Sequence, residues 1–274
     1  MRREVLLPLF LVASLSVFTG CSEEPAPVAE PEVIVIEEEA IPDDEFNFFL
    51  PSTMQIAHIL KKSGVLYEDG LTNDPEKSSQ YETRAKRLLN LGIYTGDLAY
   101  CILNNQNDMG MKYVAALKKL GNDLDLAEVY NTSEALDKME STMSNQDSLV
   151  TFIINTQEKL NDYAHTSHQL SLLLETFTGA WVETMYIGAN AGNQHPEFIH
   201  KRLAEQMGIL ENLIEGLQMT DNNNDEIKDI IDQLIDFKEA MPPYQDDFNN
   251  ELSPEQFDVL KQKITSIRNN ITNS

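Results

Sequence analysis

Two stretches of this sequence are apolar on nearly every side, and they limit the fold more than any other feature. They read LNLGIYTGDLAYCIL (89–103) and TFTGAWVETMYIGANAG (176–192). A surface helix has one apolar stripe, whereas a helix that is apolar all round must be covered by other helices. Glycine costs about 1 kcal/mol in a helix interior, so its repeated use in both stretches indicates close backbone contact. The sequence therefore predicts two central Gly-rich helices.

Helical periodicity continues through the rest of the chain from Leu50 onward, and strand-like alternation is nearly absent. A first helix is expected to begin with caps at Ser52 and Thr53 and to end at Gly64. The further predicted helical runs are 80–104, 107–121, 132–144, 146–164, 167–191, 196–218, 224–240 and 254–272. Short links favour antiparallel neighbours. We therefore expect one all-α domain over residues 49–274, a multi-helix bundle of about eight to nine mostly antiparallel helices.

The N-terminus has the pattern of a secretory signal. Arg2 and Arg3 precede the uncharged run VLLPLFLVASLSVF, and the small residues Thr19 and Gly20 follow it. At about 1.5 Å per residue this run is shorter than the roughly 30 Å hydrocarbon core of a bilayer. The alternatives are a membrane-anchor helix and a buried helix, and Pro8 disfavours both. Residues 1–20 are thus predicted to be a signal peptide.

The stretch VFTGC resembles a bacterial lipobox, in which the thiol of the cysteine is acylated and the cysteine becomes the first residue after cleavage. Phe18 departs from the pattern, because leucine is commoner there. The resemblance implies that Cys21 is lipidated; a simple cleaved signal is the alternative. Each buried acyl CH₂ contributes about 0.8 kcal/mol, so the several acyl chains of such a lipoprotein anchor it stably. The second of the two cysteines, Cys101, then has no disulfide partner and is expected to be a buried thiol.

An acidic, proline-rich segment follows Cys21, and no lysine or arginine occurs between Cys21 and Leu60. Such a composition favours an extended, disordered chain, so residues 21–48 are predicted to be a tether. Ser22, Glu23 and Glu24 resemble the export signal of Bacteroidota-type lipoproteins. That resemblance implies display on the outer face of the outer membrane, which we favour over the alternative, retention on its periplasmic face.

The formal net charge of −25 disfavours nucleic acid and anionic lipid headgroups as partners. Asp162, His165 and His168 have helical spacing that would suit zinc, but a solvated helix end explains them as well. The cluster at 221–225 partly matches a calcium loop and is expected to be a polar turn. No nucleophile elbow, phosphate-binding loop or HExxH motif occurs in the sequence. We therefore predict no metal and no cofactor.

Two acids, Asp97 and Glu183, lie within the two apolar stretches, near Tyr100, Trp181 and Tyr186. A buried carboxyl group is costly unless it is paired, and its pKa tends to rise. In one interpretation these five residues line a ligand pocket. In the other, which we favour, they form a polar network in the core, and each acid bonds a tyrosine or an arginine such as Arg84 or Arg87. No residue is predicted to be catalytic, although an enzyme remains a third hypothesis.

The motifs LNLGIYTGDLAY, KYVAALKKLGNDL and GAWVETMYIG, with FFLPS before the first helix, resemble an uncharacterised family of all-helical lipoproteins from Bacteroidota-type bacteria. The resemblance covers about residues 46–240. It implies a helical fold and a lipid-anchored place in the cell envelope, and it implies no activity or catalytic residue. The expectation is an envelope lipoprotein whose helical domain meets another envelope protein or a small ligand.

Overall fold

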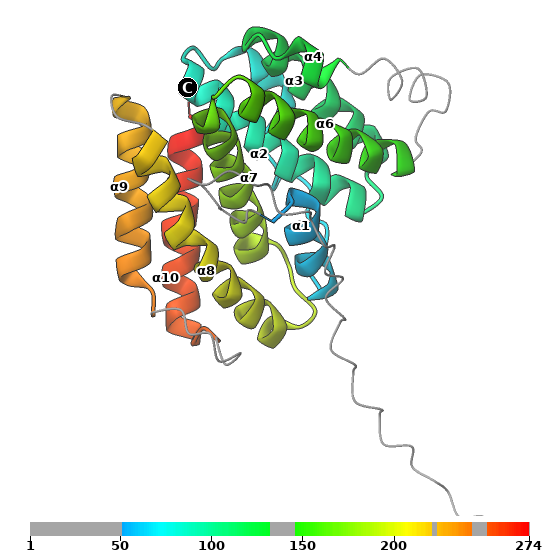
Figure 1. The fold of residues 1–274 in the computed structure, drawn as a ribbon. Helices are drawn as coiled ribbons and strands as arrows, with labels where there is room; N and C mark the ends of the chain where they lie inside the picture. Colours follow the sequence, from blue (N-terminus) through cyan, green and yellow to red (C-terminus); the bar gives the residue numbers. More distant parts are fainter. Residues whose placement is uncertain (1–50, 132–145, 221–223, 243–250, 274) are drawn as a thin grey trace, which may run out of the picture. The chain divides into compact units, whose positions relative to one another are not determined.

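The structure is a computed structural model, and it describes residues 51–131, 146–220, 224–242 and 251–273 (Figure 1). These residues form nine α-helices and one short 3₁₀ helix. The elements are α1 (Thr53–Lys62), η1 (Pro75–Ser79), α2 (Arg84–Leu103), α3 (Asn107–Asp123), α4 (Ala127–Tyr130), α6 (Gln146–Thr166), α7 (Leu170–Asn190), α8 (Pro196–Thr220), α9 (Asp225–Ala240) and α10 (Pro254–Thr272). The predicted all-α class is confirmed.

Local capping chemistry fixes where several helices begin. The Ser52 hydroxyl accepts a hydrogen bond from the Gln55 backbone N–H at 3.2 Å, and the Gln55 side chain accepts one from the Ser52 N–H at 2.8 Å. Ser253 and Gln256 form the same capping box at the start of α10, where Pro254 occupies the first helical position. Both helix starts agree with the prediction.

Some predictions lie outside the described residues. They are the signal peptide, most of the tether, the acylation site at Cys21, the export signal at residues 22–24 and the helix at 132–144. The helices that the structure describes do not include one with the length and apolar character that a bilayer crossing requires.

The two predicted central helices are α2 and α7, which lie side by side in the middle of the bundle (Figure 1). Fifteen of the 20 residues of α2 and 16 of the 21 residues of α7 are buried, so both are covered on nearly all sides. One apolar cluster joins α7 to α8, α9 and α10. A second joins α2 to α3, α4 and α6 on the other side of the pair.

The backbones of α2 and α7 touch at two glycines. A Cβ atom added to Gly92 would lie 1.9 Å from the carbonyl oxygen of Thr176, and one added to Gly179 would lie 1.8 Å from that of Leu89. No side chain separates the helices there, because neither position has room for a single methyl group. This contact sets the spacing of the pair on which both apolar clusters are built.

We predict that Gly92→Ala and Gly179→Ala each lower the free energy of unfolding by about 3 kcal/mol or more, because the added methyl group meets rigid backbone. Urea denaturation followed by circular dichroism measures this. Gly110→Ala on α3 is the control, since its Cβ would meet a movable side-chain atom, Leu149 Cδ1, at 3.0 Å. Its effect should stay below about 1 kcal/mol, offset by the better helix propensity of alanine. Equal effects at the three positions would contradict the close contact.

Candidate functional site

The candidate site is the place where the two acids of the central helices meet. Asp97 on α2 and Glu183 on α7 are both fully buried, with no exposed surface. Gly96 lies beside them, and a Cβ atom added to it would come within 3.1 Å of Glu183 Cβ. The missing side chain at Gly96 therefore leaves the space in which Glu183 lies against α2.

Arg268 of α10 neutralises Glu183. Its Nε donates to Glu183 Oε2 at 2.9 Å and its Nη2 donates to Oε1 at 3.2 Å, so both carboxylate oxygens are engaged. The guanidinium also lies over the ring of Tyr186, 4.6 Å from the ring centroid. A two-point guanidinium–carboxylate pair is among the strongest hydrogen-bonded ion pairs, and the aromatic face adds to it. Glu183 is therefore the paired carboxylate of the site.

Asp97 has a different environment. Its Oδ2 accepts a hydrogen bond from the backbone N–H of Asn73 at 3.1 Å, whereas Oδ1 receives none from any described residue. Burial, the negative charge of Glu183 and a hydrogen bond between the two carboxyl groups raise the pKa of Asp97 well above its ordinary range. Oδ1, which accepts no hydrogen bond from a described residue, is the oxygen that can carry the proton. A neutral Asp97 beside the Glu183–Arg268 pair leaves the cluster without net charge.

Tyrosine hydroxyls attach the segment between α1 and α2 to these helices. Tyr94 donates to the carbonyl oxygen of Asp74 at 2.9 Å, and Tyr113 donates to that of Asn73 at 2.8 Å. Tyr100 donates to the carbonyl oxygen of Leu66 at 2.7 Å, and burial raises the pKa of its phenol to about 12. The segment is thereby held at three points, and Asn73 connects it directly to Asp97.

The prediction that an acid of this site bonds an arginine is confirmed for Glu183, but the arginine is neither Arg84 nor Arg87. Arg84 donates to the side chain of Gln169 at 3.0 Å, and Arg87 donates to the carbonyl oxygen of Tyr81 at 2.9 Å. The partner is Arg268, which sequence analysis missed. It lies next to the apolar stripe of an amphipathic helix, where most charged side chains face solvent, and nothing in the local sequence marks it as buried.

The five predicted residues of this site do not all come together. Asp97, Glu183 and Tyr186 meet around Arg268, and Tyr100 bonds the α1–α2 segment instead. Trp181 precedes Glu183 by two residues, so it lies on another side of α7. Its ring packs against Phe237 of α9, with the ring centroids 6.3 Å apart.

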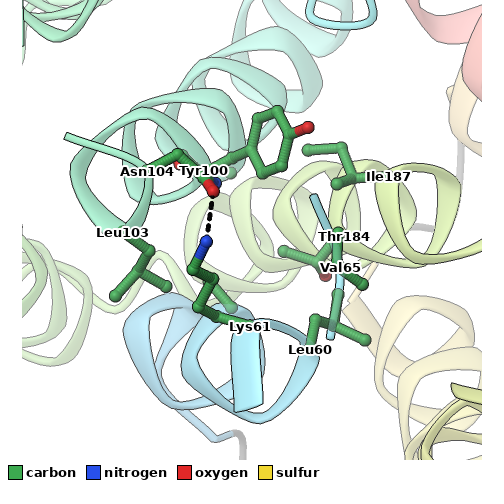
Figure 2. Close-up of a pocket in the computed structure, with 10 residues that line it drawn as sticks. Leu60, Lys61, Val65, Tyr100, Leu103, Asn104, Thr184 and Ile187 are labelled. Atoms are coloured by element: carbon green, nitrogen blue, oxygen red, sulfur yellow. Dashed lines mark hydrogen bonds between the residues drawn. The ribbon is translucent and has the colours of Figure 1, made fainter. Parts of the chain in front are cut away.

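A small cavity lies between α1, α2 and α7, with Gly96, Tyr100 and Thr184 among the residues that line it (Figure 2). Its volume of about 10 Å³ is the room of a single water molecule. At its rim, Lys61 Nζ donates to Asn104 Oδ1 at 2.6 Å. Asp97, Glu183 and Trp181 line neither this cavity nor a second, larger one between α2, α6 and α7. The acids therefore engage other groups of the domain and do not face these cavities.

Within the described ranges, no group of three His, Cys, Asp or Glu side chains is arranged to hold a metal ion, and Asp162, His165 and His168 do not form one. The 221–225 cluster lies partly outside those ranges. Cys101 is fully buried, and burial raises the pKa of its thiol. Since the thiolate is the reactive form, this cysteine is chemically inert.

We predict that Asp97→Asn leaves the protein at least as stable as the native form at pH 7, because an asparagine amide reproduces the bonds of a protonated aspartate in the folded state and has no proton to lose in the unfolded state. Glu183→Gln should cost about 3–5 kcal/mol, since it leaves the Arg268 guanidinium without its carboxylate. Urea denaturation of both variants at pH 7 tests this. An Asp97→Asn variant as damaged as Glu183→Gln would mean that Asp97 carries a charge.

The raised pKa of Asp97 also predicts how stability depends on pH. Between the ordinary pKa, 3.8, and the raised folded value, the folded state keeps a proton that the unfolded state has lost. Stability is therefore lost as pH rises through that window, by up to about 1.4 kcal/mol per pH unit. Asp97→Asn removes this loss, so the variant should gain stability relative to the native protein as pH rises from the ordinary pKa toward the raised folded value. Parallel urea curves with a constant difference would contradict the assignment.

Comparisons with known protein families, with curated proteins and with solved structures found no match for this chain. The resemblance to all-helical envelope lipoproteins stays a prediction from the sequence motifs.

Proposed function

We propose that this protein is a membrane-anchored lipoprotein of the cell envelope, in which a helical domain serves as a binding or structural module without catalytic activity. The observation that carries the proposal is Cys21, which stands between an uncharged apolar run and an acidic, proline-rich segment. An acylated cysteine at that point would fix the chain to a bilayer, and residues 21–48 would serve as the tether.

The burial of Cys101 supports this assignment. Its side chain is fully enclosed in the core between α2 and its neighbours, where a second cysteine has no access to it. Cys21 therefore has no disulfide partner in the chain, which agrees with a role in attachment.

The geometry of the acid pair supports a module that binds or scaffolds. Glu183 is paired with Arg268, and Asp97 accepts a hydrogen bond from the Asn73 backbone. These bonds join α2, α7, α10 and the α1–α2 segment, so the most conspicuous polar groups of the core are engaged in holding the helices together. The partner that we propose is another envelope protein, met by the surface of the domain at the end of its tether.

We predict that Cys21→Ser releases the protein from the membrane fraction or leaves it unprocessed, and that it abolishes metabolic labelling with palmitate. Cys101→Ser is the matched control and should leave fractionation and labelling unchanged. Continued labelling and membrane fractionation of Cys21→Ser would overturn the lipoprotein proposal.

Protease treatment of intact cells then distinguishes display on the outer face of the outer membrane from retention on its periplasmic face. Digestion of the native protein supports surface display through Ser22, Glu23 and Glu24, and protection places it on the periplasmic face.

A further inference from the structure

The larger cavity is lined by residues of α2, α3, α6 and α7, together with Thr53 at the start of α1 and Tyr130 of α4. Its volume is about 50 Å³. Phe152, Leu160 and Phe177 contribute to its mostly apolar walls. None of the described residues that line it is charged. A ligand with a net charge would find no counter-ion there, and a buried unpaired charge is costly.

Two threonines among the lining residues have an unusual property. Thr156 on α6 and Thr176 on α7 are 6% and 7% exposed, and neither hydroxyl has a hydrogen-bond partner among the described residues. A buried hydroxyl without a partner destabilises a fold, and buried polar groups normally bond another protein group, an ordered water or a ligand.

Other threonines of the same two helices show that a backbone carbonyl oxygen is normally available to accept a hydrogen bond from a threonine hydroxyl. The hydroxyls of Thr151, Thr166, Thr178 and Thr184 each donate to the carbonyl oxygen four residues earlier, at 2.7–2.9 Å. This is the ordinary way in which a helix satisfies a threonine. Thr156 and Thr176 do not bond their own helices, and their hydroxyls stay available to an occupant of the cavity.

We propose that this cavity binds the polar end of a small neutral amphiphile, a short-chain alcohol or carbonyl compound. The hydroxyl or carbonyl group of the ligand would bond Thr156 and Thr176, and its alkyl part would lie against Phe152, Leu160 and Phe177. The volume is well below the roughly 150 Å³ that accommodates benzene, which limits the enclosed part to a few atoms. The inference concerns the helical domain alone and is independent of acylation at Cys21.

A titration of the full chain with 1-butanol, followed by methyl NMR, tests the proposal. We expect saturable shifts confined to methyl groups that line the cavity, such as those of Thr156, Leu160 and Thr176. Sodium butyrate, which has the same chain length and a charge, should produce none. Shifts that grow linearly without saturation would overturn the proposal and leave the cavity to water alone. Equal binding of butyrate would also overturn it, because the cavity would then not select a neutral ligand.

Valine substitutions make the test specific to the hydroxyls, because valine keeps the shape of threonine. The double variant Thr156→Val/Thr176→Val should bind 1-butanol at least tenfold more weakly, yet melt about 2–4 °C higher because the unpaired hydroxyls are gone. Thr178→Val is the matched control, since that hydroxyl is satisfied within α7. It should bind normally and melt no higher than the native protein. A double variant with native affinity would overturn the proposal whatever its stability.

Discussion

The backbone contact between α2 and α7 is the constraint on which the rest of this structure depends. Gly92 and Gly179 lie so close to the opposite helix that a methyl group at either position would overlap a carbonyl oxygen. Because the two helices touch there, their other sides are covered by further helices. These form one apolar cluster with α7 and a second with α2. Helices α8, α9 and α10 complete one cluster, and α3, α4 and α6 complete the other.

The same close approach brings Asp97 and Glu183 together in the dry interior. Two carboxyl groups in such a place cannot both be charged, and the cluster resolves this with a proton on Asp97 and a guanidinium from Arg268. The resulting neutral network ties α10 and the α1–α2 segment to the central pair. Within it, both carboxylate oxygens of Glu183 bond Arg268, and Asp97 Oδ2 bonds the backbone of Asn73. The hydroxyls of Thr156 and Thr176, which have no hydrogen-bond partner among the described residues, line a separate cavity that we propose as a ligand site.

Much of this fold can be predicted from the sequence, because local patterns of apolar and capping residues indicate where the helices lie. The all-round apolar character of 89–103 and 176–192 predicted the central pair, and Ser52 predicted the start of the first helix through its capping side chain. The partner of Glu183 was not predictable, since Arg268 is 85 positions away and its burial depends on how α10 docks. The side of α7 on which Trp181 lies also depends on how the helices pack, and so does the lack of a hydrogen-bond partner for Thr156 and Thr176 among the described residues. No single stretch of sequence determines this packing. Short elements such as α4 and η1 are too brief to show a period.

Native-state hydrogen exchange of the backbone amides tests the role of the central pair most directly. If the α2–α7 contact is the foundation of the domain, amides around Gly92 and Gly179 exchange only through global unfolding. Their protection then equals the full free energy of unfolding, while the covering helices α9 and α10 also open locally at lower free energy. If the α2 and α7 amides exchange through local openings of lower free energy than the openings of α9 and α10, this account is contradicted.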